Sequence, residues 1–113
     1  MSGLTSHVLD TALGVPAAGV AVTLFELQDE RRWHEHTTLR TDTDGRTGDF
    51  FDGAYLHAGT YRLRFALGEY HESMGTVGFY PHVDIEFVVT DATKPCHIPL
   101  LVSPFGYTTY RGS

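Results

Sequence analysis

The chain has 113 residues, of which 42% are hydrophobic, and its formal net charge at pH 7 is −6. A domain of this size buries roughly two-thirds of its unfolded surface, so we expect one folded domain covering residues 1–113. Its eight basic residues never cluster beyond a pair, which speaks against nucleic-acid binding because phosphate recognition needs a basic face. No apolar run approaches the ~20 residues of a membrane helix, so no membrane partner is expected.

The compartment is suggested by the first residues and by the cysteine count. The start of the chain lacks both the basic region and the apolar region of a signal peptide. Cys96 is the single cysteine, which excludes an internal disulfide and fits a reducing compartment. A cytoplasmic location is therefore expected.

The first half of the chain reads as strands and turns. Residues 4–9 alternate between apolar and polar side chains, as a half-buried strand does. Residues 19–27 are rich in β-branched and aromatic side chains, which favours a more buried strand. A turn at residues 28–30 leads into a polar strand over residues 32–41.

The second half repeats this pattern and adds one helix. Residues 61–67 and 83–87 alternate cleanly, and residues 97–103 and 107–110 are strand-like. Residues 67–73 carry helix formers and predict a single short helix. Seven or eight short strands with regular turn signals predict an all-β fold, an antiparallel two-sheet β-sandwich with one short helix.

Alternation sends two histidines, His7 and His97, away from the predicted core. The residues expected to face the core are Leu4, Ser6, Val8, Ile98, Leu100 and Val102. Those expected to point outward are Thr5, His7 and Leu9 on the first strand and His97, Pro99, Leu101 and Ser103 on the second. If the two strands are neighbours, this half-apolar outer face is typical of a ligand groove or a subunit interface. Simple exposure of both histidines to solvent is the alternative.

The other five histidines are interpreted as ordinary polar residues. His57, His71 and His82 are expected in loops. His34 and His36 share one face of a polar strand and could chelate a metal, but a protein metal site needs further ligands. Neither a metal nor another cofactor is therefore expected.

The last four residues, Tyr110-Arg111-Gly112-Ser113, combine an aromatic hydroxyl, a permanent cation, a hydroxyl and the terminal carboxylate. Such a cluster suits a chain end that is held in place to line a site, although an ordinary solvated tail is the alternative. Residues 107–110 read as a flat, uncharged sheet edge, which favours pairing with a second copy across a two-fold axis.

Three segments together resemble the transthyretin superfamily. Ser-His-Val-Leu-Asp at residues 6–10 resembles its opening, and Thr-Asp-Thr-Asp-Gly-Arg at residues 41–46 resembles the Thr-x-x-Asp-Gly-Arg turn of its enzymatic branch. Residues 97–113, from His-Ile-Pro-Leu-Leu to Tyr-Arg-Gly-Ser, resemble the ending of the 5-hydroxyisourate hydrolases. Asp42 departs from the family, which more often has asparagine there; as a turn residue it puts no chemistry in doubt.

This resemblance implies a transthyretin-like sandwich assembled as a homotetramer, a dimer of dimers, without any cofactor. Its active sites are expected in a channel enclosed by outer sheet faces at the dimer–dimer interface. The implied reaction is hydrolysis of 5-hydroxyisourate, a small-molecule intermediate of urate breakdown, to 2-oxo-4-hydroxy-4-carboxy-5-ureidoimidazoline.

The site residues follow from matching positions of the motifs and from the chemistry of amide hydrolysis. His7 is expected to act as general base, and His97 to orient the water or the substrate. Arg46 supplies a planar cation for the ureide carbonyls and the developing oxyanion.

The ending of the chain completes this expected set. Tyr110 is expected to contact the substrate, and Ser113 with its carboxylate to complete the network around the imidazoles. Arg111 either binds substrate or ties the terminus down by an ion pair. Two other functions stay open: a non-catalytic carrier of the transthyretin type, and a structural or adhesive sandwich module.

Overall fold

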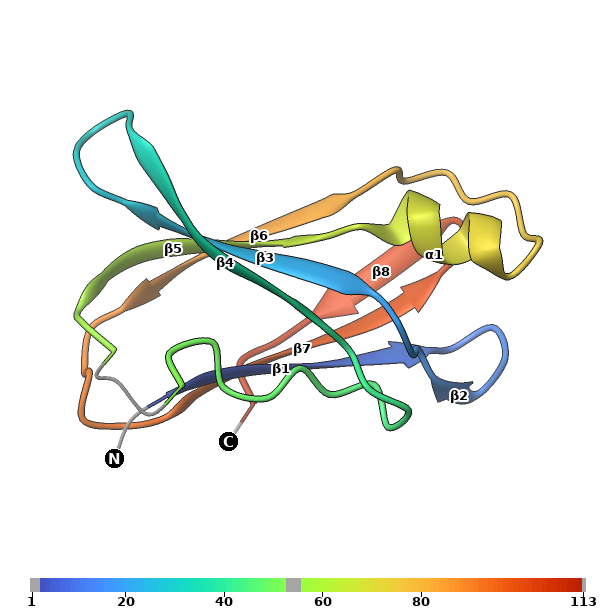
Figure 1. Cartoon of the computed structure of the whole chain (residues 1–113), viewed down its shortest axis with the longest axis horizontal. Helices are drawn as coiled ribbons and strands as arrows, with labels where there is room; N and C mark the ends of the chain where they lie inside the picture. Colours follow the sequence, from blue (N-terminus) through green and yellow to red (C-terminus); the bar gives the residue numbers. More distant parts are fainter. Residues whose placement is uncertain (1–2, 53–55, 113) are drawn as a thin grey trace.

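The computed structural model describes residues 3–52 and 56–112 and shows two four-stranded sheets packed face to face (Figure 1). One sheet has the order β2-β1-β7-β8 and the other has the order β4-β3-β5-β6. The elements are β1 (Leu4–Asp10), β2 (Val15–Pro16), β3 (Ala21–Leu27), β4 (Trp33–Arg40), β5 (Gly59–Phe65), α1 (Leu67–Ser73), β6 (Val83–Val89), β7 (Cys96–Ser103) and β8 (Gly106–Thr109). The predicted two-sheet sandwich with one short helix is confirmed, and α1 has the predicted bounds.

One pairing differs from the expected antiparallel pattern. β1 and β7 run parallel, with Thr5 opposite His97 and His7 opposite Pro99, whereas the other strand pairs are antiparallel. Alternation along a strand carries no information about the direction of its neighbour. Strands so far apart in the sequence need no hairpin, so the long connection allows either direction.

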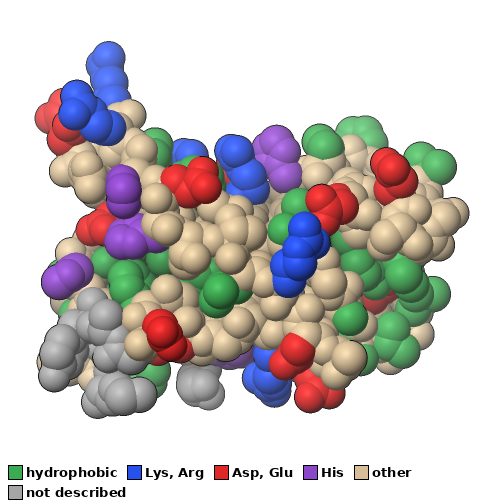
Figure 2. All heavy atoms as spheres, viewed as in Figure 1, with side chains coloured by type: hydrophobic (Ala, Val, Ile, Leu, Met, Phe, Trp, Pro, Cys, Tyr) green, Lys and Arg blue, Asp and Glu red, His purple; other side chains and the backbone are tan. Residues whose placement is uncertain are grey.

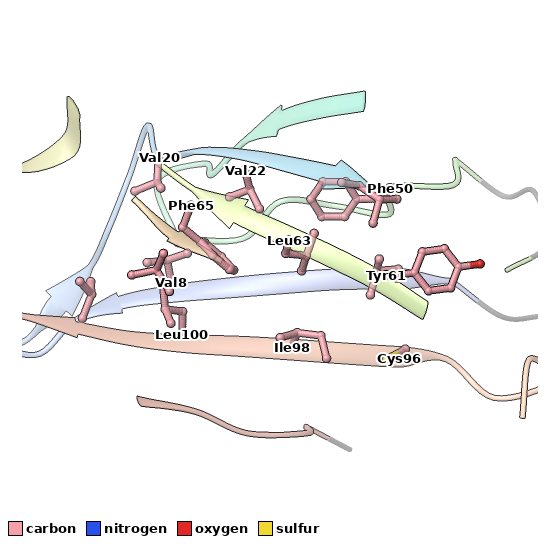
Figure 3. Close-up of a cluster of buried hydrophobic side chains, with 14 of the residues drawn as sticks. Val8, Val20, Val22, Phe50, Tyr61, Leu63, Phe65, Cys96, Ile98 and Leu100 are labelled. Carbon is pink, nitrogen blue, oxygen red and sulfur yellow. The ribbon is translucent and has the colours of Figure 1, made fainter. Parts of the chain in front are cut away.

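The core lies between the sheets, and the residues of β1 and β7 that alternation predicts to face it are buried. Ser6 is the polar one among them, and its hydroxyl donates a hydrogen bond to the Ile98 carbonyl at 2.7 Å, so this polar group is satisfied inside the sandwich. Pro99, expected on the outward face, is nevertheless buried because β7 lies between β1 and β8. The side chains that meet in the core include Val8, Ile98 and Leu100 from one sheet and Val22, Leu63 and Phe65 from the other (Figure 3).

Helix α1 is fixed to the end of β1 by a buried hydrogen bond. The Tyr70 hydroxyl donates to the Asp10 carboxylate at 2.7 Å, and the second oxygen of that carboxylate accepts the amides of Ala12 and Leu13 at 3.0 Å. Burial and the neighbouring carboxylate raise the pKa of Tyr70 to about 12. The hydroxyl therefore stays a donor across the physiological range.

Replacing Tyr70 with phenylalanine is expected to lower the free energy of unfolding by about 1–3 kcal/mol, because it leaves a buried carboxylate oxygen without its donor. Denaturant unfolding followed by circular dichroism measures the change. Tyr107→Phe is the matched control, since Tyr107 is 42% exposed. Equal losses in the two variants would show that the buried bond contributes nothing.

The surface carries acidic and basic side chains interspersed on the face drawn in Figure 2. Green hydrophobic side chains gather in that view at the end where α1 lies. In residues 3–52 and 56–112, no helix is both long and apolar enough to span a membrane.

Candidate active site

Strands β1 and β7 present both predicted histidines on the outer face of their sheet. The parallel register sets Thr5 beside His97, and one imidazole nitrogen, Nδ1 of His97, lies 2.8 Å from the Thr5 hydroxyl. His7 follows two residues along β1 and therefore shares that face. The two imidazoles thus lie on neighbouring strands, opposite the core.

Arg46 reaches this face through a turn that packs against β1. The Asp42 carboxylate accepts the amides of Asp44 at 2.8 Å and Arg46 at 3.0 Å. These backbone hydrogen bonds hold the pKa of Asp42 below its usual range. The backbone of Arg46 forms an isolated antiparallel bridge with that of His7, so the two side chains leave the backbone on the same face.

The same turn selects the tautomer of His7. Its Nε2 lies 2.8 Å from the carbonyl oxygen of Asp44. A carbonyl oxygen can only accept, so Nε2 carries the hydrogen, and the neutral ring keeps its lone pair on Nδ1. The basic nitrogen of His7 is therefore Nδ1.

Gly45 allows this close approach. Its φ is +78°, and a Cβ there would collide with the Val8 carbonyl oxygen and lie 3.3 Å from the Cδ2 atom of His7. The backbone of the turn can lie against β1 because glycine has no side chain.

A shallow depression of about 600 Å³ lies over this region, within the size range of small-molecule sites. Its lining comprises Thr5, Ser6, Asp42, Arg46, Gly48, Pro95 and His97. His7 is not part of that lining. It lies on β1, where its backbone pairs with the backbone of Arg46. The depression therefore joins one imidazole, a guanidinium, a carboxylate and the Thr5 hydroxyl on the half-apolar outer face of the sheet.

The end of the chain folds back along β7 beyond β8. The Gly112 amide donates to the His97 carbonyl at 2.8 Å, and a Cβ on Gly112 would lie 2.6 Å from the Cδ2 atom of His97. The register of β8 continues to this bridge, which sets Tyr110 and Gly112 on the outward face with His97. Tyr110 is 55% exposed there. Ser113 lies outside the described residues.

Arg111 points the other way. When the pairing of β7 with β8 is extended to the bridge between His97 and Gly112, Arg111 lies opposite Ile98, whose side chain faces the core. Arg111 and Ile98 both line a separate cavity of about 410 Å³. The structure therefore brings together His7, Arg46 and His97, with Tyr110 at the margin, but not Arg111. Two-residue alternation through positions 110–112 is the sequence signal that separates Arg111 from its neighbours.

Residues 4–112 match the model of the HIUase/Transthyretin family. The chain belongs to this family. It is 47% identical to the 5-hydroxyisourate hydrolase of Caulobacter vibrioides over 100% of both chains. It is 43% identical to the mouse 5-hydroxyisourate hydrolase over 99% of this chain and 96% of the mouse protein.

Solved structures of the HIUase/Transthyretin fold agree with this assignment. The 5-hydroxyisourate hydrolase of Klebsiella pneumoniae superposes with a TM-score of 0.86 at 35% identity, covering 99% of this chain and 100% of that one. Sea bream transthyretin in complex with thyroxine superposes with a TM-score of 0.91 at 27% identity, covering 97% of this chain and 94% of that one. The fold is thus common to a 5-hydroxyisourate hydrolase and to a transthyretin that binds thyroxine.

The remaining histidines of this family member form no metal centre: residues 3–52 and 56–112 contain no group of three metal-ligating side chains. His36 instead pairs with Glu26 at 2.7 Å. The expectation that His71 lies in a loop is wrong, because His71 lies in α1 and its side chain is buried. Neither nitrogen of its ring has a hydrogen-bond partner within the described residues. Its ring packs directly beneath Gly78, where a Cβ would collide with it, so backbone covers it.

The electrostatics of the site keep one imidazole neutral. Burial, followed by the charges of Arg46 and His7, lowers the pKa of His97 below 6.5. The unfolded chain takes up a proton at about 6.5, before the folded chain does. The contribution of His97 to stability is therefore complete above that pH and is lost as the pH falls through the folded pKa.

An NMR titration is expected to give His97 a midpoint below 6.5 in the folded protein. Arg46→Gln should move this midpoint upward, because it removes one positive charge that opposes protonation. Arg31→Gln, an exposed cation beyond the end of β3, should leave it unchanged. A midpoint at or above 6.5, or one insensitive to Arg46, would contradict the coupling.

Proposed function

We propose that the protein hydrolyses the ring amide of 5-hydroxyisourate, opening it to 2-oxo-4-hydroxy-4-carboxy-5-ureidoimidazoline. The observation that carries this proposal is the convergence of His7, Arg46 and His97 on one outer sheet face. Full-length relatives named 5-hydroxyisourate hydrolase support it further. A cyclic amide needs a base for water, an oxyanion stabiliser and groups that orient a planar ligand. These side chains supply all three.

In this mechanism Nδ1 of His7 accepts a proton from water as the water oxygen attacks the ring carbonyl. The oxyanion that forms is stabilised by the Arg46 guanidinium, a fixed planar cation. The carbon–nitrogen bond then breaks, and the protonated His7 returns its proton to the departing nitrogen. The products of the step are a carboxyl group and a ureido N–H, so the atoms balance.

His97 orients the reactants rather than taking the proton. Its lowered pKa keeps it neutral near pH 7, with Nδ1 on the Thr5 hydroxyl and Nε2 left to bind water or substrate. We assign Tyr110 to substrate contact, and Ser113 with its carboxylate to the network around the imidazoles. The close contact of Gly112 with the His97 ring supports a role for the chain end in setting its position.

The proposed assembly is a homotetramer in which two such faces enclose a channel. Leu9 and Leu101 support this, because both are half-buried apolar residues on the outward face of β1 and β7. β6 and β8 are edge strands, available to pair within each dimer. The single, buried Cys96 fits a reducing compartment, so we propose the cytoplasm.

A non-catalytic carrier is the second candidate, favoured by the high structural similarity to a transthyretin that binds thyroxine. A ligand that is mostly apolar rings gains nothing from two imidazoles at its site, since unpaired polar groups are costly to desolvate. The polar set on β1, on β7 and in the turn at residues 41–46 therefore favours the hydrolase.

Freshly generated 5-hydroxyisourate distinguishes the two functions. The hydrolase is expected to remove its absorbance over many turnovers per subunit, far faster than the spontaneous decay. A carrier would remove at most one equivalent per site and leave the decay rate of the remainder unchanged, which would refute the proposed activity.

A further inference from the structure

A second cavity lies along the edge of the sandwich between β6 and β7, on the core-facing side of β7. Its volume of about 410 Å³ is within the range of small-molecule sites. One wall is apolar and the other is charged. The lining residues that matter are Phe87, Val88 and Ile98 on the apolar side and Asp91, Lys94 and Arg111 on the charged side.

This cavity and the depression with Arg46 and His97 both border a third cavity, and Lys94 and Arg111 line both the second and the third. The third cavity has a volume of about 460 Å³, and its lining also includes Pro95 and Gly112. Pro95 in turn lines the depression. His97 follows Lys94 by three positions, which is at most about 11 Å of chain. The third cavity, which both cations line, therefore borders the depression, with Pro95 common to the two linings.

The lining of this cavity carries more positive than negative charge. Among residues 3–52 and 56–112, neither Lys94 nor Arg111 lies within salt-bridge distance of a carboxylate. Hydrogen bonds from Thr93 hold the pKa of Asp91 below its usual range, and Lys94 and Arg111 lower it further. Two cations and one carboxylate give the lining a net charge of +1, on a chain whose net charge is −6.

We propose that this cavity binds a small planar carboxylate between Lys94 and Arg111, and that its ligand is the ring-opened product of the reaction. The identity of the ligand rests on the proposed function. Hydrolysis of the ring amide breaks one carbon–nitrogen bond and converts a ring carbonyl into a carboxylate. The two cations favour that anion over the ring-closed substrate, while Phe87 and Ile98 pack against its flat ring.

Hydantoate and hydantoin test this directly, since they are a stable ureido carboxylate and its ring-closed form. In an NMR titration of the wild-type protein, hydantoate is expected to shift the amides of Lys94, Cys96 and Arg111. Lys94→Gln and Arg111→Gln should each weaken hydantoate binding about three- to tenfold, the scale of one charge-assisted contact near the surface. Binding of hydantoin should not weaken, and Arg31→Gln should affect neither ligand.

Two results would overturn the proposal: hydantoate shifts confined to the region of Arg46 and His97, or hydantoate affinities unchanged in both variants. The titration does not depend on turnover. Failure of the wild-type protein to open 5-hydroxyisourate would therefore refute the proposed activity, and with it the product as ligand. It would leave the measured carboxylate site in place.

Discussion

Replacing His7 with asparagine is expected to slow the loss of 5-hydroxyisourate absorbance by about 100-fold or more, the usual effect of removing a general base. Asparagine loses the contact of Nε2 with the Asp44 carbonyl and has no basic nitrogen to replace Nδ1. The turn keeps its backbone hydrogen bonds, from the Val8 amide to the Gly45 carbonyl at 2.7 Å and from the Asp44 amide to the Asp42 carboxylate at 2.8 Å. The turn should therefore stay in place while the proton acceptor is lost.

The matched control is His36→Asn, which makes the same substitution at a histidine of β4 that pairs with Glu26. It should keep wild-type turnover, and both variants should keep the wild-type oligomeric state in sedimentation analysis. Wild-type turnover in His7→Asn would remove His7 from the mechanism.

Deleting residues 110–113 is expected to abolish turnover while the sandwich core stays folded. These residues follow β8, and in the described part the tail contacts β7 through the Gly112 amide and the ring of His97. Without them His97 loses the neighbour that fixes its ring and the substrate loses Tyr110. Near-wild-type unfolding together with lost activity is the expected combination. Full activity in the truncated protein would make the tail dispensable.

A single methyl group tests the same contact more finely. Gly112→Ala would bring a Cβ to 2.6 Å from the His97 ring, so either the ring or the tail must move. Displacing a positioned group by about 1 Å can cost about 100-fold in rate, so we expect a loss of about 10–100-fold. Gly106→Ala is the matched control, because its Cβ would meet only the Ser103 hydroxyl at an ordinary 3.6 Å.

The outward position of His7 and His97 could be predicted because it depends on side-chain alternation alone. Period-two patterning decides which face a residue occupies whenever one face is buried. The bounds of α1 followed in the same way from local composition. The parallel pairing of β1 with β7 could not be predicted, because direction is set by the path of the whole chain.

Two residues show where local reasoning stopped short. The motif Tyr110-Arg111-Gly112-Ser113 predicts one shared site, although alternation sends Arg111 to the face opposite Gly112. Lys94 gave no signal at all, since an exposed lysine after a turn is ordinary. Its proximity to Arg111 arises from the pairing of β7 with the chain end, which is a tertiary contact.

The central claim is that the ring of the substrate binds in the depression. A crystal structure with urate tests this most directly, because urate is a stable bicyclic relative of the substrate. The account predicts urate in the depression on the outer face of β1 and β7, with a ring carbonyl on Arg46 and a ring edge on His97. Urate bound elsewhere, with Arg46 and His97 free of it, would contradict the account.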